Sequence, residues 1–220
     1  MFLEDLDLLW FLSAACISVT VCVFLCGIPI CRQILSKGTT EGISPFPFLV
    51  CLASTVLWTR YGLLKGDSTI IIVNCFGAIV EAFYTGFYYV YCTNRRSLQR
   101  QLLAVFLLDF TVLYYVQLDS QGPTLPTRLA HLGYVCVTLN VVNLGAPLAT
   151  LKQVVKKKST ADLPLPLIVA NFLCALLWYS YGWMVEDSFI LYPNCIGIAL
   201  GLIQLSLFAW YPRTRQRFIV

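Results

Sequence analysis

Charge is scarce in this chain of 220 residues. Only 12% of the residues are Asp, Glu, Lys or Arg, while 59% are apolar or aromatic, and the mean hydropathy is +0.77. Soluble globular domains carry about 25% charged residues, so this composition excludes a water-soluble enzyme domain. It also excludes a disordered chain and a coiled coil, which need polar or periodic sequences. The sequence therefore predicts a protein embedded in a lipid bilayer.

Histidine is the next scarcity, because His131 is the single histidine of the chain. The ten cysteines form no CxxC pair, and several of them lie inside long apolar runs. Thiols in such runs usually act as small apolar side chains rather than as ligands. The sequence also has no visible set of nucleophile and base. We therefore expect no metal site, no cofactor and no enzymatic activity.

Long apolar runs, bounded by charged or turn-forming residues, divide the chain into seven candidate spans. A helix needs about 20 residues to cross the hydrocarbon core of a bilayer. The approximate limits of the runs are residues 8–31, 45–64, 69–91, 101–118, 129–151, 165–184 and 188–211. The predicted fold class is an all-α integral membrane protein with seven transmembrane helices.

Basic residues lie mostly in alternate connections. Twelve of the fifteen follow the first, third, fifth and seventh spans: Arg32, Lys37, Arg95, Arg96, Arg100, Lys152, Lys156, Lys157, Lys158, Arg213, Arg215 and Arg217. The positive-inside rule then predicts a cytosolic C-terminus and an extracellular or lumenal N-terminus. The net charge of +4 is explained by this orientation and by contact with anionic lipid, so no nucleic-acid partner is expected.

An internal duplication appears when the sequence is shifted by 120 residues. The recurring pairs include Leu57-Trp58 with Leu177-Trp178, Tyr61-Gly62 with Tyr181-Gly182, Asp67-Ser68 with Asp187-Ser188, and Asn74-Cys75 with Asn194-Cys195. Repeated Trp, Asn and Tyr-Gly in one register indicate a structural repeat. A single span links the two units, so both have the same orientation in the membrane. We predict a 3+1+3 arrangement of two parallel triple-helix bundles, with repeats at 1–92 and 129–220 and a linker at 93–128.

Short motifs extend over nearly the whole chain. They are Thr39-Thr40-Glu41, Pro47-Phe48, Trp58, Tyr61-Gly62, Asn74, Gly77 and Glu81 in the first half, and Ala146-Pro147-Leu148, Lys157-Lys158-Ser159, Pro164, Trp178, Tyr181-Gly182, Pro193-Asn194 and Gly201-Leu202-Ile203-Gln204 in the second. Together they resemble the SWEET sugar transporters, a family with parallel repeats, and in particular its animal branch. The resemblance implies bidirectional uniport of sugars, especially monosaccharides such as glucose, by alternating access at the interface of the repeats.

Asn74 and Asn194 are the clearest polar signal within the predicted spans. An amide in hydrocarbon usually faces protein or a water-filled cavity, and helix–helix hydrogen bonding is the alternative to ligand binding. The repeat and the resemblance favour binding, because an amide donates and accepts hydrogen bonds as sugar hydroxyls do. Trp58 and Trp178 offer flat apolar faces for sugar C–H bonds. We predict that these four neutral residues bind an uncharged sugar.

Prolines form the second candidate set. The family pattern has one proline hinge in each of the first two helices of each repeat, and Pro47, Pro147 and Pro164 match it. The fourth position is ambiguous, because Pro29 is shifted by two residues and Gly27 stands opposite Pro147. Proline removes a helical hydrogen bond and clashes with the preceding turn. We predict hinges at Pro29, Pro47, Pro147 and Pro164, with Gly27 as the alternative to Pro29.

Tyr61 and Tyr181, near the outer ends of their spans, are predicted to form an extracellular gate. Glu81 has no repeat partner, since Gly201 stands opposite. A carboxylate within a span is a functional candidate, and a structural pairing is an equal alternative.

Two other readings compete with sugar transport. A PQ-loop transporter of another metabolite, such as an amino acid, has Pro-Gln after the first helix of each repeat, whereas Ile30 and Leu148 follow the prolines here. A seven-helix receptor is disfavoured by the duplication and the very short connections. We expect a plasma-membrane protein, with the Golgi or another endomembrane as alternatives. One chain contains both repeats, and a homo-oligomer is also compatible with the sequence.

Overall fold

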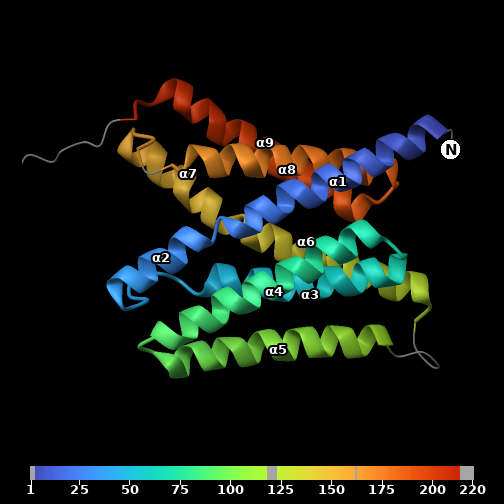
Figure 1. Cartoon of the computed structure of the whole chain (residues 1–220), viewed down its shortest axis with the longest axis horizontal. Coiled ribbons are helices and arrows are strands. Elements are labelled where there is room, and N and C mark those ends of the chain that lie inside the picture. Colours follow the sequence, from blue (N-terminus) through green and yellow to red (C-terminus); the bar gives the residue numbers. More distant parts are fainter. Residues whose placement is uncertain (1–2, 118–122, 162, 214–220) are drawn as a thin grey trace, which may run out of the picture. The chain divides into compact units, whose positions relative to one another are not determined.

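The computed structural model describes residues 3–117, 123–161 and 163–213, which form nine α-helices and no β-strand (Figure 1). The helices are α1 (Leu3–Leu25), α2 (Ile28–Lys37), α3 (Phe46–Lys65), α4 (Ser68–Tyr91), α5 (Arg95–Gln117), α6 (Leu125–Asn143), α7 (Gly145–Lys157), α8 (Leu165–Met184) and α9 (Ser188–Trp210). When α1 with α2 and α6 with α7 are each counted as one broken helix, these are the seven predicted helices. The all-α fold class is confirmed.

Six of these seven helices are long and apolar enough to cross a membrane, and they make the chain a multi-pass membrane protein. The exception within the described part of the chain is α5, for which the sequence predicted a span at 101–118. The helix begins earlier, at Arg95, and so includes Arg95, Arg96 and Arg100. These cations, together with Asp109, lower the apolar character of α5 below that of the other spans.

Two predicted spans are broken helices, which corrects the continuous limits 8–31 and 129–151. The first is α1 and α2, separated at Cys26–Gly27, and the second is α6 and α7, separated at Leu144. Both extend about six residues further than predicted, so basic residues assigned to connections, such as Arg32 and Lys152, are helical. The charged side chains therefore continue the helices rather than end them.

The chain forms two compact units by its internal contacts, Thr20–Asn143 and Met1–Val19 with Leu144–Val220. In the first of these, α3 packs against α4, α5 and α6, and α2 packs against α4. In the second, α8 packs against α9. The unit boundaries fall within α1 and at the break between α6 and α7. The predicted division at residues 92 and 128 stays a prediction.

The turns of the two helix hairpins, α3–α4 and α8–α9, are built from equivalent residues and have similar hydrogen bonds. Asp67 Oδ1 accepts a hydrogen bond from Ile70 N at 3.0 Å, and Asp187 Oδ1 accepts one from Phe189 N at 3.0 Å. Each aspartate caps the following helix, which satisfies backbone N–H groups that have no partner within the helix. Their own backbone N–H groups donate to the carbonyls of Gly62 and Gly182 at 2.9 Å. The repeated Tyr-Gly and Asp-Ser motifs thus build the corners between paired helices.

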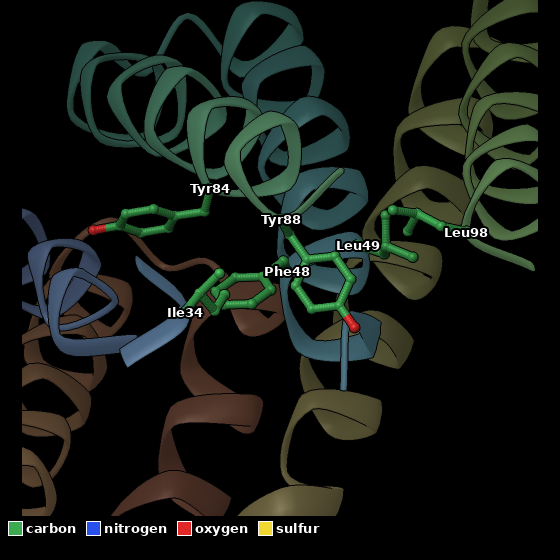
Figure 2. Packing of buried hydrophobic residues seen from close by; sticks show 6 residues of the cluster. All are labelled: Ile34, Phe48, Leu49, Tyr84, Tyr88 and Leu98. Atoms are coloured by element: carbon green, nitrogen blue, oxygen red, sulfur yellow. The ribbon is translucent and has the colours of Figure 1, made fainter. Parts of the chain in front are cut away.

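A buried cluster joins four helices of the Thr20–Asn143 unit (Figure 2). Its members are Ile34 of α2, Phe48 and Leu49 of α3, Tyr84 and Tyr88 of α4, and Leu98 of α5. The Phe48 ring lies between the two tyrosines, with centroids 5.9 Å from Tyr84 and 6.3 Å from Tyr88. The cluster fixes α2 against α4, and so positions the segment that follows the break after α1.

Candidate functional site

Asn74 and Asn194 occupy equivalent places in α4 and α9 and make the same hydrogen bond. Asn74 Nδ2 donates to the carbonyl oxygen of Ile70 at 2.9 Å, and Asn194 Nδ2 donates to that of Ile190 at 2.7 Å. Both side chains are half-buried. An amide has two N–H donors and one carbonyl oxygen. Each side chain therefore has a fixed orientation, and this hydrogen bond leaves its second N–H and its carbonyl oxygen unused.

Pro193 distinguishes the surroundings of Asn194 from those of Asn74. It is buried inside α9, immediately before Asn194, whereas Val73 precedes Asn74 in α4. Proline cannot donate to the carbonyl four residues earlier, which here is that of Phe189. Pro193 is part of the family motif Pro193-Asn194, and the sequence alone predicts no role for it. Its place inside a helix makes the second repeat locally different at the candidate site.

Trp58 and Trp178 share a local arrangement with the tyrosines one turn further on. The rings of Trp58 and Tyr61 meet edge to face at 5.2 Å and 76°, and those of Trp178 and Tyr181 at 5.5 Å and 78°. Trp58 is buried, with 8% of its surface exposed, while Trp178 is half-buried. Edge-to-face contacts hold aromatic rings in defined orientations. Each tryptophan face is thus fixed by the neighbouring tyrosine of its own helix.

The indole N–H of Trp58 has a protein partner that the sequence analysis missed. Trp58 Nε1 donates to Asn140 Oδ1 at 3.4 Å, and Ser54 Oγ donates to the same oxygen at 3.1 Å. Asn140 belongs to α6, and its partner in the 120-residue register is Thr20, so the repeat gave no signal for it. The polar part of Trp58 is thus held by a residue of another helix in the same compact unit.

Tyr61 and Tyr181 lie within their helix pairs in this arrangement. Their exposed fractions are 1% and 4%. The glycine after each tyrosine allows a close approach of the next helix, because a Cβ at Gly62 would lie 3.0 Å from Ile70 Cγ2 and one at Gly182 would lie 3.0 Å from Leu191 N. The tyrosines therefore help to pack the hairpins, and their role as an extracellular gate stays a prediction.

The four predicted hinge prolines fall into two structural groups. Pro29 and Pro147 follow the two helix breaks, and α1 and α6 end at Leu25 and Asn143. Each of these is the residue four before the proline, whose carbonyl loses its normal helical partner. The break in the first repeat thus lies just before Pro29, at the distance that its shifted position dictates.

Pro47 and Pro164 are instead at helix starts. Pro47 is the second residue of α3, and Pro164 immediately precedes α8. Proline costs little there, since the first N–H groups of a helix have no partner within it. These two prolines set where the helices begin, and they bend no helix in this arrangement.

Gly27 has a role of its own beside Pro29. A Cβ at Gly27 would lie 2.4 Å from Tyr84 Cε2, so the tyrosine ring occupies the space that glycine leaves. Tyr84 also donates its hydroxyl to the carbonyl oxygen of Phe24 at 3.0 Å, one of the last carbonyls of α1. The ring and hydroxyl of Tyr84 therefore hold the break between α1 and α2 in its observed shape.

The family model described as a sugar efflux transporter for intercellular exchange matches the chain twice, at residues 10–96 and 130–216. The chain belongs to the SWEET sugar transporter family. The two matched segments are 120 residues apart, which confirms the internal duplication. Membership in the SWEET family favours the sugar-transporter reading over the PQ-loop and receptor alternatives.

Individual SWEET proteins match over most of the chain. Sugar transporter SWEET1 of Caenorhabditis elegans is 40% identical over 91% of this chain and 65% of its own length. The SWEET1 proteins of Drosophila pseudoobscura pseudoobscura and Xenopus tropicalis are 39% and 38% identical, over 91% and 94% of this chain and 88% and 96% of their own lengths. The solved structure of a eukaryotic SWEET transporter is 25% identical, with a TM-score of 0.85 over 96% of this chain and 99% of that chain.

Proposed function

We propose that this protein is a sugar uniporter that moves monosaccharides such as glucose in both directions across a membrane. Support comes from its SWEET family membership and from relatives named sugar transporters, including the bidirectional sugar transporter N3 of Medicago truncatula. The proposal is alternating access, in which the two repeats move about the bound sugar. Uniport moves the sugar down its own gradient without an ion.

The observation that carries the proposal is the matching geometry of Asn74 and Asn194. Both amides are anchored by one N–H to the preceding turn of their own helix. The remaining N–H and the carbonyl oxygen suit a hydroxyl group, which also donates and accepts. In this proposal each amide binds the sugar, and no charged side chain is required. An uncharged polyol fits this chemistry better than an amino acid does.

Trp58 and Trp178 provide the apolar part of the proposed recognition. A sugar ring has C–H bonds on its faces, and an indole ring offers a flat apolar surface to them. Asn140 and Ser54 position Trp58 through the shared oxygen. Each indole ring is also larger than other side chains that could stand at its position, which supports a monosaccharide over a disaccharide in this proposal.

In this proposal, the two helix breaks, between α1 and α2 and between α6 and α7, act as the hinges. α2 and α7 each begin at a break, where Pro29 or Pro147 cannot donate to the carbonyl of Leu25 or Asn143, so each helix can change its angle with little loss of backbone hydrogen bonding. Pro47 and Pro164 define the helix starts that follow α2 and α7 in sequence. Tyr61 and Tyr181 would open on the opposite side as the outer gate. We place the protein in the plasma membrane, with its C-terminus in the cytosol.

Flux from proteoliposomes tests the proposal. Purified protein would be reconstituted and loaded with radiolabelled glucose, sucrose or an amino acid, with and without a proton gradient. We expect glucose to equilibrate in both directions, sucrose and the amino acid to remain trapped, and the proton gradient to cause no accumulation. Accumulation of glucose against its gradient would contradict uniport. Transport of the amino acid in place of glucose would contradict the substrate class.

A further inference from the structure

Glu81 and Thr85 bring two buried polar atoms to one face of α4. Their exposed fractions are 6% and 7%. Glu81 Oε2 and Thr85 Oγ1 are both enclosed, and neither has a hydrogen-bond partner among the described residues. Residues four apart in a helix lie one above the other on the same face. Native proteins seldom leave such atoms unsatisfied, so the pair calls for an explanation that the sugar site does not supply.

The groups that face Glu81 are neutral. From α3, the thiol of Cys51 donates to the carboxyl group, and from α6 Asn143 Nδ2 donates to Cys51 Sγ at 3.6 Å. The other titratable groups close enough to interact with Glu81 are Cys31 of α2 and Tyr84 of α4. Among the described residues, no lysine, arginine or histidine acts on this carboxyl group. The site therefore has no cation to balance a charged Glu81.

Protonation removes the uncompensated charge of Glu81. A buried carboxylate without a cationic partner is strongly disfavoured, and such groups become neutral by binding a proton. The resulting O–H is a donor, and Thr85 Oγ1, one turn away on the same face of α4, is an acceptor that a rotation of the side chains brings within reach. Cys51 continues to donate to the carboxyl group. The helix pair can then enclose Glu81 without a buried charge.

We propose that Glu81 is a proton-binding site, which holds a proton in the arrangement seen here, with Cys51 as its hydrogen-bond donor and Thr85 as a neutral neighbour on the same face of α4. Loss of the proton leaves a buried charge between α3 and α4, and water must enter this helix pair to solvate it. Removal of the proton at alkaline pH therefore loosens the packing and slows transport. The effect on transport rests on the proposed function, whereas proton binding by Glu81 does not.

Infrared spectroscopy of the full chain in liposomes tests proton binding directly. At about pH 7, an ordinary glutamate, with a pKa of about 4.3, is ionised and lacks the carbonyl band of a protonated carboxyl group. We expect this band in the wild type and a weaker band in Glu81→Gln, because Asp109, whose Oδ1 is also buried without a partner among the described residues, is a second carboxyl group that contributes to this region. Glu186→Gln, an exposed control, should leave the band unchanged. Identical spectra for the wild type and Glu81→Gln in this region would overturn the proposal.

Glucose flux measured over a series of pH values tests the consequence. Glutamine mimics the neutral acid, so Glu81→Gln should keep wild-type flux and lose the decline at alkaline pH. Thr85→Val removes the acceptor and should move the decline to lower pH. A Glu81→Gln protein that folds but carries no glucose, with flux restored by Glu81→Asp, would show that the charge is needed and would overturn the proposal. If the wild type carries no sugar, the proposed function fails, and the infrared result still decides the state of Glu81.

Discussion

Trp58 donates its indole N–H to Oδ1 of Asn140 at 3.4 Å, joining α3 to α6. The two residues lie in different matched segments of the SWEET family model, yet both belong to the compact unit Thr20–Asn143. Ser54 shares the same acceptor oxygen. This single amide therefore fixes the orientation of one proposed sugar-binding ring. It also links the first sequence repeat to the second within one packed unit.

Replacing Asn140 should weaken sugar transport without unfolding the protein. Asn140→Ala removes the acceptor of both Trp58 and Ser54, and one hydrogen bond contributes about 1 kcal/mol, which corresponds to about a fivefold change in flux at limiting sugar. Initial rates of glucose uptake into proteoliposomes measure the effect. Thr138→Ala, on an exposed part of the same helix, is the control. Equal rates for Asn140→Ala and the control would contradict a positioning role.

A methyl group at Gly27 should destabilise the break between α1 and α2. The new Cβ would lie 2.4 Å from the ring of Tyr84, and such overpacking costs about 1–3 kcal/mol. Gly145→Ala is the matched control, because nothing lies within 4 Å of a Cβ at that position. Thermal unfolding in detergent should show a lower midpoint for Gly27→Ala alone. A midpoint equal to that of Gly145→Ala would show that Tyr84 does not fill this space.

Substitution of either proline that follows a helix break by alanine should slow transport and leave the stability of the protein unchanged or higher. Pro29→Ala and Pro147→Ala each supply an N–H for the carbonyls of Leu25 and Asn143, which favours a straighter helix. The unfolding midpoint is expected to stay the same or rise, and glucose flux is expected to fall. Pro126→Ala, near the start of α6, controls for the loss of a proline. Unchanged flux in both variants would argue against the breaks as hinges.

Much of the helical layout could be predicted from the sequence. Apolar runs located the helices, and residues 165–184 were predicted with the observed limits of α8. The repeat identified Asn74 with Asn194, and the two side chains make equivalent hydrogen bonds. These features depend on local sequence, because hydrophobic length and backbone hydrogen bonding act over a few turns.

Features that depend on distant contacts could not be predicted. Asn140 meets Trp58 across 82 positions of sequence, and its repeat partner is Thr20, so neither local pattern nor duplication pointed to it. The break after Leu25 involves Pro29 within its own segment, but its shape also depends on Tyr84 of α4. The early start of α5 at Arg95 was missed because its basic first turn resembles a connection.

Glucose counterflow in proteoliposomes containing Asn74→Ala or Asn194→Ala tests the central claim most directly. Cys75→Ala and Cys195→Ala, at the exposed neighbouring positions, serve as matched controls for expression, folding and reconstitution. We predict that each asparagine variant has the same thermal unfolding midpoint as its control. Each asparagine variant is predicted to lose glucose counterflow, whereas both cysteine controls retain it. Normal counterflow in both asparagine variants would contradict sugar binding by the paired amides.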